Sequence, residues 1–529
     1  MRRTGIPMLL LVVAAACGAP LSQVPVDAGR PDAGEPDAGE PDAGAPDGGG
    51  LVQAFTHGRL MGEVMPRVSG AGLRLKHRGD TRYLLELTRD ARGVERRRLV
   101  ASGPDGERWV RAEAPGEQLT SFALHPSGEL TVGIERRDAA RDAFDLVRLD
   151  ALGRELHRQQ LAAPRTIPPQ DFAAGLPAEP FLMKGVLDTS VVTGWLPWLA
   201  LEARGEDVVV ALVTYTAVPG AGPSDADVLS AVLALKWSGS AFTEEWARMV
   251  DGRHSLIAVA WQYDEFLWLD AATRLLLSVD PDGSVVVGRT LGSSRCSAVV
   301  ATFGELSTQR CRQLRADTTP HRYQPFAFTA FSAQGQRLGT QTFAPSGFED
   351  FVVFDMAVRG DRVAVVGTAV QLDPDTGSPD YYFEPPGHSS GTPLSPYDGY
   401  LAVLDRQTGA PLHTATVDLG RAEHLSAVTW TSEGLVAAGG AGWNRWWGGM
   451  SISRGAEPLL VLDRLDGSAP LSRHLATALG DRHAHALCLD TDGERVWAAG
   501  PFDAPMTHSG DADIAPMAFG GFTLTLSAR

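Results

Sequence analysis

The chain repeats one short pattern of strand, turn and strand, and this repeat restricts the fold more than any other feature. The stretch LAVLDRQTGAPL, residues 401–412, returns 58 residues later as LLVLDRLDGSAPL, residues 459–471. In each copy an apolar run ends at an aspartate, and a turn that contains glycine leads into a second run. Short Val- and Leu-rich runs bounded by glycine turns predict β-strands joined in tight hairpins.

A second pair of strands precedes each hairpin, so the repeating unit is four strands long. The segment LSAVTWTSEGLVAAGG (425–440) comes before the second copy, and FVVFDMAVRGDRVAVVG (351–367) comes before the first. No helical period continues through a unit, which predicts an all-β chain. A four-stranded sheet that recurs along a chain is typical of β-propeller blades, because one sheet cannot bury both faces until neighbours stack on it. We count seven or eight units; a solenoid or two β-sandwiches are the alternatives.

Earlier units are looser, and the last one is incomplete. Residues 199–247, 257–290 and 298–343 each look like one unit, whereas the unit that ends in FTLTLSA (522–528) lacks a strand. We therefore expect a strand from residues 51–68 to complete the last blade and close the ring.

The clearest units resemble the repeats of bacterial β-propeller families of the SBBP kind. In those repeats a strand, a glycine turn and a glycine-ended strand come before an acidic LD-x-x-G hairpin, as in AVTWTSEGLVAAGG (427–440) and DGYLAVLDRQTG (398–409). The resemblance implies a propeller fold and an extracytoplasmic location. It brings no catalytic residues to this chain.

Residues 1–16 have the layout of a signal peptide that precedes a lipidated cysteine. Arg2 and Arg3 come before an apolar run that is too short to span a bilayer, and the run ends in small residues before Cys17. The stretch VVAAACG (12–18) resembles the lipobox of bacterial lipoproteins, and Gly18 resembles their outer-membrane sorting signal. The sequence thus predicts a cell-envelope lipoprotein in the outer membrane, with an ordinary secreted protein or a short membrane anchor as the alternatives.

Residues 17–50 carry PDAG repeats with prolines every five residues and almost no apolar side chains. Such a segment cannot build a core, and proline together with like charges keeps it extended. We interpret it as a disordered spacer, and residues 51–529 as the β-propeller domain. The net charge of −17 repels nucleic acid, which we exclude as a partner.

Cysteines and aspartates offer a few further sites. Cys296 and Cys311 flank an alternating segment with a central glycine, which predicts a hairpin and, in an oxidising compartment, a disulfide. Cys488 is expected to be a small buried residue. No cofactor is predicted; calcium at DPDTGSPD (373–380) is the alternative, although the glutamate that ends a calcium loop is missing.

Long insertions fall between the second and third strands of their units, at 217–226, 371–398, 441–457 and 501–519. In an antiparallel blade this connection lies on the same side as the crossing to the next blade, so the insertions should share one face. Loops on a rigid scaffold are where binding usually resides. The candidate ligand-binding residues on this face are His424, His483, His485, Trp443, Trp446 and Trp447.

The sequence therefore favours a membrane-tethered propeller that binds a ligand, a glycan or a protein segment, or acts as a scaffold. The alternative is an extracytoplasmic enzyme, a glycan hydrolase or lyase built on one face of the propeller. Two carboxylates that meet a histidine or tyrosine in the central channel would favour the enzyme.

Overall fold

The computed structural model describes the propeller domain and not the segments before it. The signal peptide, Cys17 and the spacer lie outside the described residues, so their boundaries stay predictions. Every regular element that the structure describes is a β-strand, and in this part of the chain no helix is long and apolar enough to cross a membrane. The described residues are 53–57, 60–67, 71–89, 95–136, 144–161, 199–216, 227–250, 275–290, 326–345, 348–371, 397–419, 423–441, 457–474, 488–503 and 519–528.

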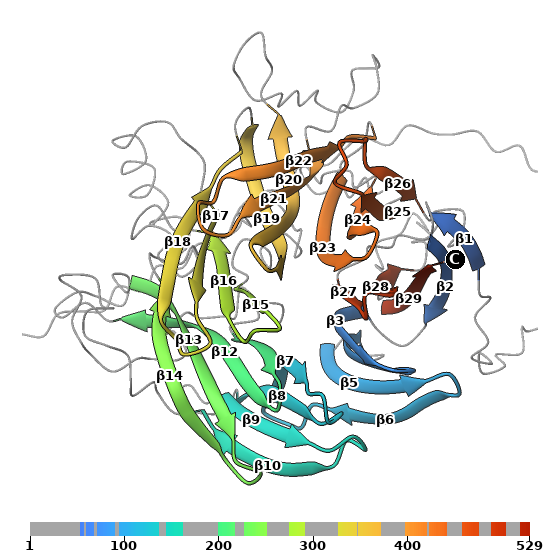
Figure 1. Ribbon diagram of the computed structural model, residues 1–529. Helices are drawn as coiled ribbons and strands as arrows, with labels where there is room; N and C mark the ends of the chain where they lie inside the picture. The colour runs from blue at the N-terminus through green and yellow to red at the C-terminus, as the bar shows by residue number, and fades with distance from the viewer. Residues whose placement is uncertain are drawn as a thin grey trace, which may run out of the picture. The chain divides into compact units, whose positions relative to one another are not determined.

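The strands pair antiparallel into seven sheets that stand around a ring as the blades of a propeller (Figure 1). The all-β β-propeller predicted from the sequence is thus confirmed, with seven blades, which we letter A to G. The first four are A, with β3 (Ala71–Arg78), β4 (Thr81–Arg89), β5 (Glu95–Gly103) and β6 (Gly106–Ala112); B, with β7 (Glu117–Leu124), β8 (Leu130–Arg136), β9 (Phe144–Leu149) and β10 (Glu155–Gln160); C, with β11 (Leu199–Arg204), β12 (Asp207–Thr216), β13 (Asp227–Trp237) and β14 (Phe242–Val250); and D, with β15 (Leu276–Val279), β16 (Val285–Thr290), β17 (Phe326–Phe331) and β18 (Arg337–Phe343).

Blade D corrects the sequence interpretation of this region. The two units expected at 257–290 and 298–343 share a single sheet, because residues 291–325 connect its second strand to its third. Two of the remaining blades have four strands each. They are E, with β19 (Phe348–Arg359), β20 (Arg362–Gln371), β21 (Tyr397–Asp405) and β22 (Pro411–Val417), and F, with β23 (Glu423–Thr431), β24 (Gly434–Ala441), β25 (Glu457–Asp463) and β26 (Leu471–His474).

Blade G closes the ring with strands from both ends of the described chain. It contains β27 (Cys488–Thr491), β28 (Arg495–Asp503) and β29 (Phe519–Ala528), and then β2 (Leu60–Arg67) and β1 (Gln53–His57). Strand β2 pairs with β29, with Leu60 opposite Ala528, and Figure 1 shows the two side by side. The expectation that a strand from residues 51–68 completes the last blade is confirmed, and β1 adds a fifth strand that the repeat did not predict.

The core lies between the blades. The first strand of every blade lies nearest the centre and contacts the first strand of the next, from β3 through β7, β11, β15, β19, β23 and β27 back to β3. Because each sheet is covered on both faces by its neighbours, strands such as β9 and β17 are buried along their whole length. This explains why the strands are continuous runs of apolar residues and do not alternate with polar ones.

In blades B, D and E, the glycine turn between the third and fourth strands receives a side chain from the preceding blade. Trp246 on β14 packs on Gly335, in the turn between β17 and β18, and its Nε1 donates a hydrogen bond of 2.9 Å to Ala333 O. Trp109 on β6 packs in the same way on Gly153 and donates one of 3.0 Å to Ala151 O. We call this arrangement the indole–turn contact.

The same geometry recurs between blades D and E with an amide in place of the indole. Gln341 on β18 packs on Gly409, and its Nε2 donates to Gln407 O. In all three contacts the accepting carbonyl belongs to the residue two positions before the glycine. In these three blades the turn is therefore the surface on which the outer strand of the previous blade docks, whereas Gly106, Gly239 and Gly467 in the corresponding turns of blades A, C and F have no such neighbour.

Candidate functional site

The described strand ends divide the propeller into two different faces. The insertion face carries the crossings between blades and the connections between second and third strands; the turn face carries the other two turns of each blade. The insertions predicted at 217–226, 371–398, 441–457 and 501–519 all connect a second strand to a third. Because this connection lies at the same end of every antiparallel blade, all four insertions start from the insertion face.

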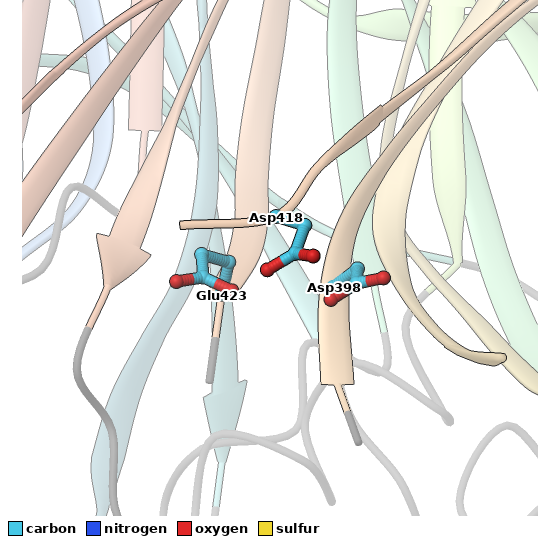
Figure 2. Close-up of side chains that lie close together, drawn as sticks. All are labelled: Asp398, Asp418 and Glu423. Atoms are coloured by element: carbon cyan, nitrogen blue, oxygen red, sulfur yellow. The ribbon is translucent and has the colours of Figure 1, made fainter. Parts of the chain in front are cut away.

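Three carboxylates meet on the insertion face between blades E and F. Asp398 lies near the start of β21, Asp418 follows the end of β22, and Glu423 begins β23. One carboxylate oxygen from each lies within 4.8 Å of the others (Figure 2). Asp398 and Glu423 are buried, with 6% and 1% exposure, whereas Asp418 is exposed.

A threonine holds two of these residues in place. The Thr368 hydroxyl, on β20, lies 3.2 Å from Asp398 O and 3.1 Å from Glu423 O, within hydrogen-bond distance of both. Carboxylate oxygens are the ligands that a hard cation such as Ca²⁺ prefers, and the three oxygens are close enough together to reach one such ion. Arg421, which lies between Asp418 and Glu423 in the sequence, is outside the described residues.

We call Asp398, Asp418 and Glu423 the acidic cluster. Its residues come together only through the topology of blades E and F, and sequence reasoning missed it. The aspartates for which calcium was considered, 373–380, lie outside the described residues. A usable signal was the position of the acidic residues, since Asp398 and Glu423 lie within the first two residues of strands that start at the insertion face of consecutive blades.

His424 is the one ligand-binding candidate that the structure describes. Its side chain is buried, and its ring meets that of Phe354 edge-on with the centroids 6.2 Å apart. Burial lowers the pKa of His424 to about 4, so the ring is neutral near neutral pH. His424 therefore packs beneath the insertion face. It does not form part of its surface.

The other candidate residues lie outside the described part of the chain and stay predictions. Cys488 is described, and its predicted burial is confirmed: it packs against Leu75 and Trp497. The candidates that remain to be placed are Cys17, Cys296, Cys311, Trp443, Trp446, Trp447, His483 and His485.

A second polar cluster lies in the central channel, on the innermost strands. Arg74 on β3 donates from Nη2 to Glu202 Oε1 on β11 at 2.6 Å. Lys76, also on β3, places its Nζ 3.2 Å from Glu202 Oε2 and 4.0 Å from Asp490 Oδ1 on β27. Blades A, C and G thus meet through charged side chains. We call these four residues the channel cluster.

His77 adds an imidazole beside this cluster. Its Nδ1 lies 2.5 Å from Asp490 Oδ2, its backbone N donates to the same oxygen at 2.7 Å, and its ring stacks on Trp497. Two carboxylates and a histidine are therefore close to one another, which is the combination expected of an enzyme. The Lys76 ammonium, however, contacts both carboxylates, so each already has a cationic partner.

The charge state of Glu202 also limits acid–base chemistry. Burial alone would raise the pKa of its carboxyl, but Lys76 and Arg74 outweigh burial and hold that pKa below its ordinary value. A carboxylate that stays ionised in this way is a poor general acid at neutral pH. Sequence reasoning missed the channel cluster because its residues come from three distant segments without a common motif.

Comparisons with known proteins leave the family open. No family model matches the chain, and no curated protein matches it either. Solved structures with a similar arrangement include a Dos1 propeller, with 9% identity, a TM-score of 0.39, and coverage of 90% of this chain and 95% of that one. The α-L-arabinofuranosidase Arb93A from Fusarium graminearum has 11% identity, a TM-score of 0.36, and coverage of 78% and 93%. With scores this low, neither likeness bears on function.

Proposed function

We propose that the protein is a ligand-binding propeller, held at the outer membrane by a lipid on Cys17, whose ligand engages the insertion face. One observation carries the binding part of this proposal. The long insertions between second and third strands all start from one face of a closed ring, whereas the turns of the opposite face are short. Variable loops on a rigid scaffold are the common form of a binding surface.

The chemistry of the insertions suggests a glycan or a protein segment as the ligand. The connection between β24 and β25 contains Trp443, Trp446 and Trp447, and His483 and His485 precede β27 in the sequence. Indole rings offer large flat apolar surfaces together with an N–H donor, which suits both sugar rings and apolar side chains. Neutral, buried His424 lies at the start of β23, at the insertion face.

A glycan hydrolase or lyase is the second candidate, and the meeting of Glu202, Asp490 and His77 near the channel favours it. The pairing of both carboxylates with Lys76 argues against it, because an acid or base must be able to exchange its proton. Glu202→Gln separates the two functions. It should abolish an activity that depends on the channel and leave binding at the insertion face unchanged.

The binding proposal is tested with the mature chain on arrays of glycans and cell-envelope proteins. A variant with Trp446→Ala, Trp447→Ala and His483→Ala should bind its array target at least about tenfold more weakly, since central aromatic contacts dominate binding energies. The matched control carries Leu152→Ala and Leu412→Ala, which remove exposed apolar side chains away from the insertion face. Equal loss of binding in both variants would contradict the assignment of the face.

A further inference from the structure

We propose that the channel cluster, Arg74, Lys76, Glu202 and Asp490, is an ionic latch that clamps blade A to blades C and G and opens at high ionic strength. This inference is independent of the ligand and of the membrane anchor. It concerns how the ring is held shut at its centre.

Arg74 reaches further than an ordinary contact between neighbouring blades. Its Nε donates to Phe122 O on β7 at 2.8 Å, and its Nη2 donates to Leu201 O on β11 at 2.6 Å as well as to Glu202. One guanidinium therefore joins the innermost strands of blades A, B and C. These carbonyls lie on the inner edges of their sheets, where no further strand pairs with them, so the guanidinium supplies a partner that the sheet cannot.

Lys76 and His77 extend the cluster to the last blade. Lys76 contacts Glu202 on one side and Asp490 on the other, and Asp490 accepts from His77 at both the ring and the backbone. Asp490 belongs to β27 of blade G, the blade that the first and last strands complete. The latch thus connects the closing blade to the third blade through side chains of β3.

The exposure of the latch makes it sensitive to salt. Its four side chains are 16–26% exposed, so they are partly withdrawn from water but remain within reach of dissolved ions. Ion pairs in this position are weakened when salt screens their attraction. The hydrophobic contacts between blades are not loosened in this way, because salt does not weaken the burial of apolar surface. High salt should therefore loosen the centre of the ring selectively.

Cys488 provides a natural probe for such an opening. Its thiol is buried against Leu75, which lies between Arg74 and Lys76 on β3. If the latch opens and β3 moves away from β27, the thiol becomes accessible to a small alkylating reagent. Trypsin cleavage after Arg482 and Arg495 isolates Cys488 from the other cysteines, so its labelling is measured alone by mass spectrometry.

The experiment compares Glu202→Gln with the control Glu245→Gln in the mature chain at fixed pH. Both substitutions remove an ion pair from blade C, but Glu245 pairs with Arg204 of its own blade and does not reach the channel. Glu202→Gln removes the anionic partner of both Arg74 and Lys76. At low salt it should label Cys488 at least about tenfold faster than wild type, since the loss of one charged hydrogen bond alone corresponds to a factor of that size. Glu245→Gln should label at the wild-type rate.

A salt series on the unmodified chain provides a second test that does not depend on the variants folding. At about 1 M sodium chloride charges are screened beyond about 3 Å, so wild-type labelling should rise towards the rate of Glu202→Gln. Hydrogen exchange in β16 and β17, in blade D, should stay constant and so exclude global unfolding. Equal rates in the two variants, or wild-type labelling that ignores salt, would overturn the latch.

Discussion

The indole–turn contact predicts that two glycines in similar turns differ greatly in their tolerance of alanine. Gly335 has a φ of +75°, and a Cβ atom there would lie 2.4 Å from Trp246 Cδ2. Gly239 has a φ of +89°, but a Cβ atom there would meet nothing within 4 Å. Gly239→Ala should therefore cost only the left-handed backbone, about 1–2 kcal/mol of the free energy of unfolding.

Gly335→Ala adds a steric collision to that backbone cost. Overpacking a tight contact costs about 1–3 kcal/mol more, so the total should reach about 2–5 kcal/mol. Trp246→Ala alone should cost about 3–5 kcal/mol, because Trp246 is buried and also donates to Ala333 O. In the double variant the collision is gone, and Gly335→Ala should cost only as much as Gly239→Ala does.

The assay is urea unfolding followed by circular dichroism, since tryptophan fluorescence would change with the substitution itself. The double-mutant cycle isolates the coupling between Trp246 and Gly335, which should be at least about 1 kcal/mol. If Gly335→Ala and Gly239→Ala destabilise the wild-type chain equally, the indole is not fitted to the turn, and this explanation of the repeated hairpin is wrong.

Three further predictions concern other parts of the chain. Burial and Arg148 lower the pKa of His125 from 6.5 to about 4 in the folded protein. Because the unfolded chain binds this proton more tightly, the free energy of unfolding is highest above pH 6.5 and falls by about 3 kcal/mol as the pH drops to 4. Thermal melts across this range should show that slope in wild type, and His125→Gln should flatten it. Deleting residues 53–67 removes β1 and β2 and leaves one edge of β29 unpaired, so the melting temperature should fall by at least about 5 °C, and an unchanged melt would argue against closure by β2. Cys17→Ser should move the protein from the membrane fraction to the soluble one, and unchanged detergent partitioning would rule out the lipid anchor.

Features that depend on short segments could be predicted from the sequence. Apolar runs and glycine turns are local signals, so they indicated the blades, the position of the insertions and the missing strand of the last blade. The division at 257–290 and 298–343 failed because the insertion at 291–325 separates two halves of one sheet. Strand β1 was missed because a fifth strand has no counterpart in the other units.

Contacts between distant segments could not be predicted in the same way. Arg74 and Glu202 are 128 positions apart, and their hydrogen bond exists only because blades A and C both place their first strands at the centre. The acidic cluster likewise depends on the packing of blade E against blade F. Charged residues occur on the innermost strands of several blades, such as β7, β19 and β23, so the sequence offered no signal that singled out Arg74, Lys76 and Glu202.

The pairing of β2 with β29 also determines when blade G can form during synthesis of the chain. Strand β2 is made before blades A to F, whereas its partner β29 is made after them. Blade G therefore cannot be completed until all six other blades have been synthesised, and the slow search for this long-range pairing starts only then. Until then the edges of β2 and β28 that pair with β29 are exposed and prone to association with other chains. A nascent chain of this design needs protection from the synthesis of β2 until that of β29.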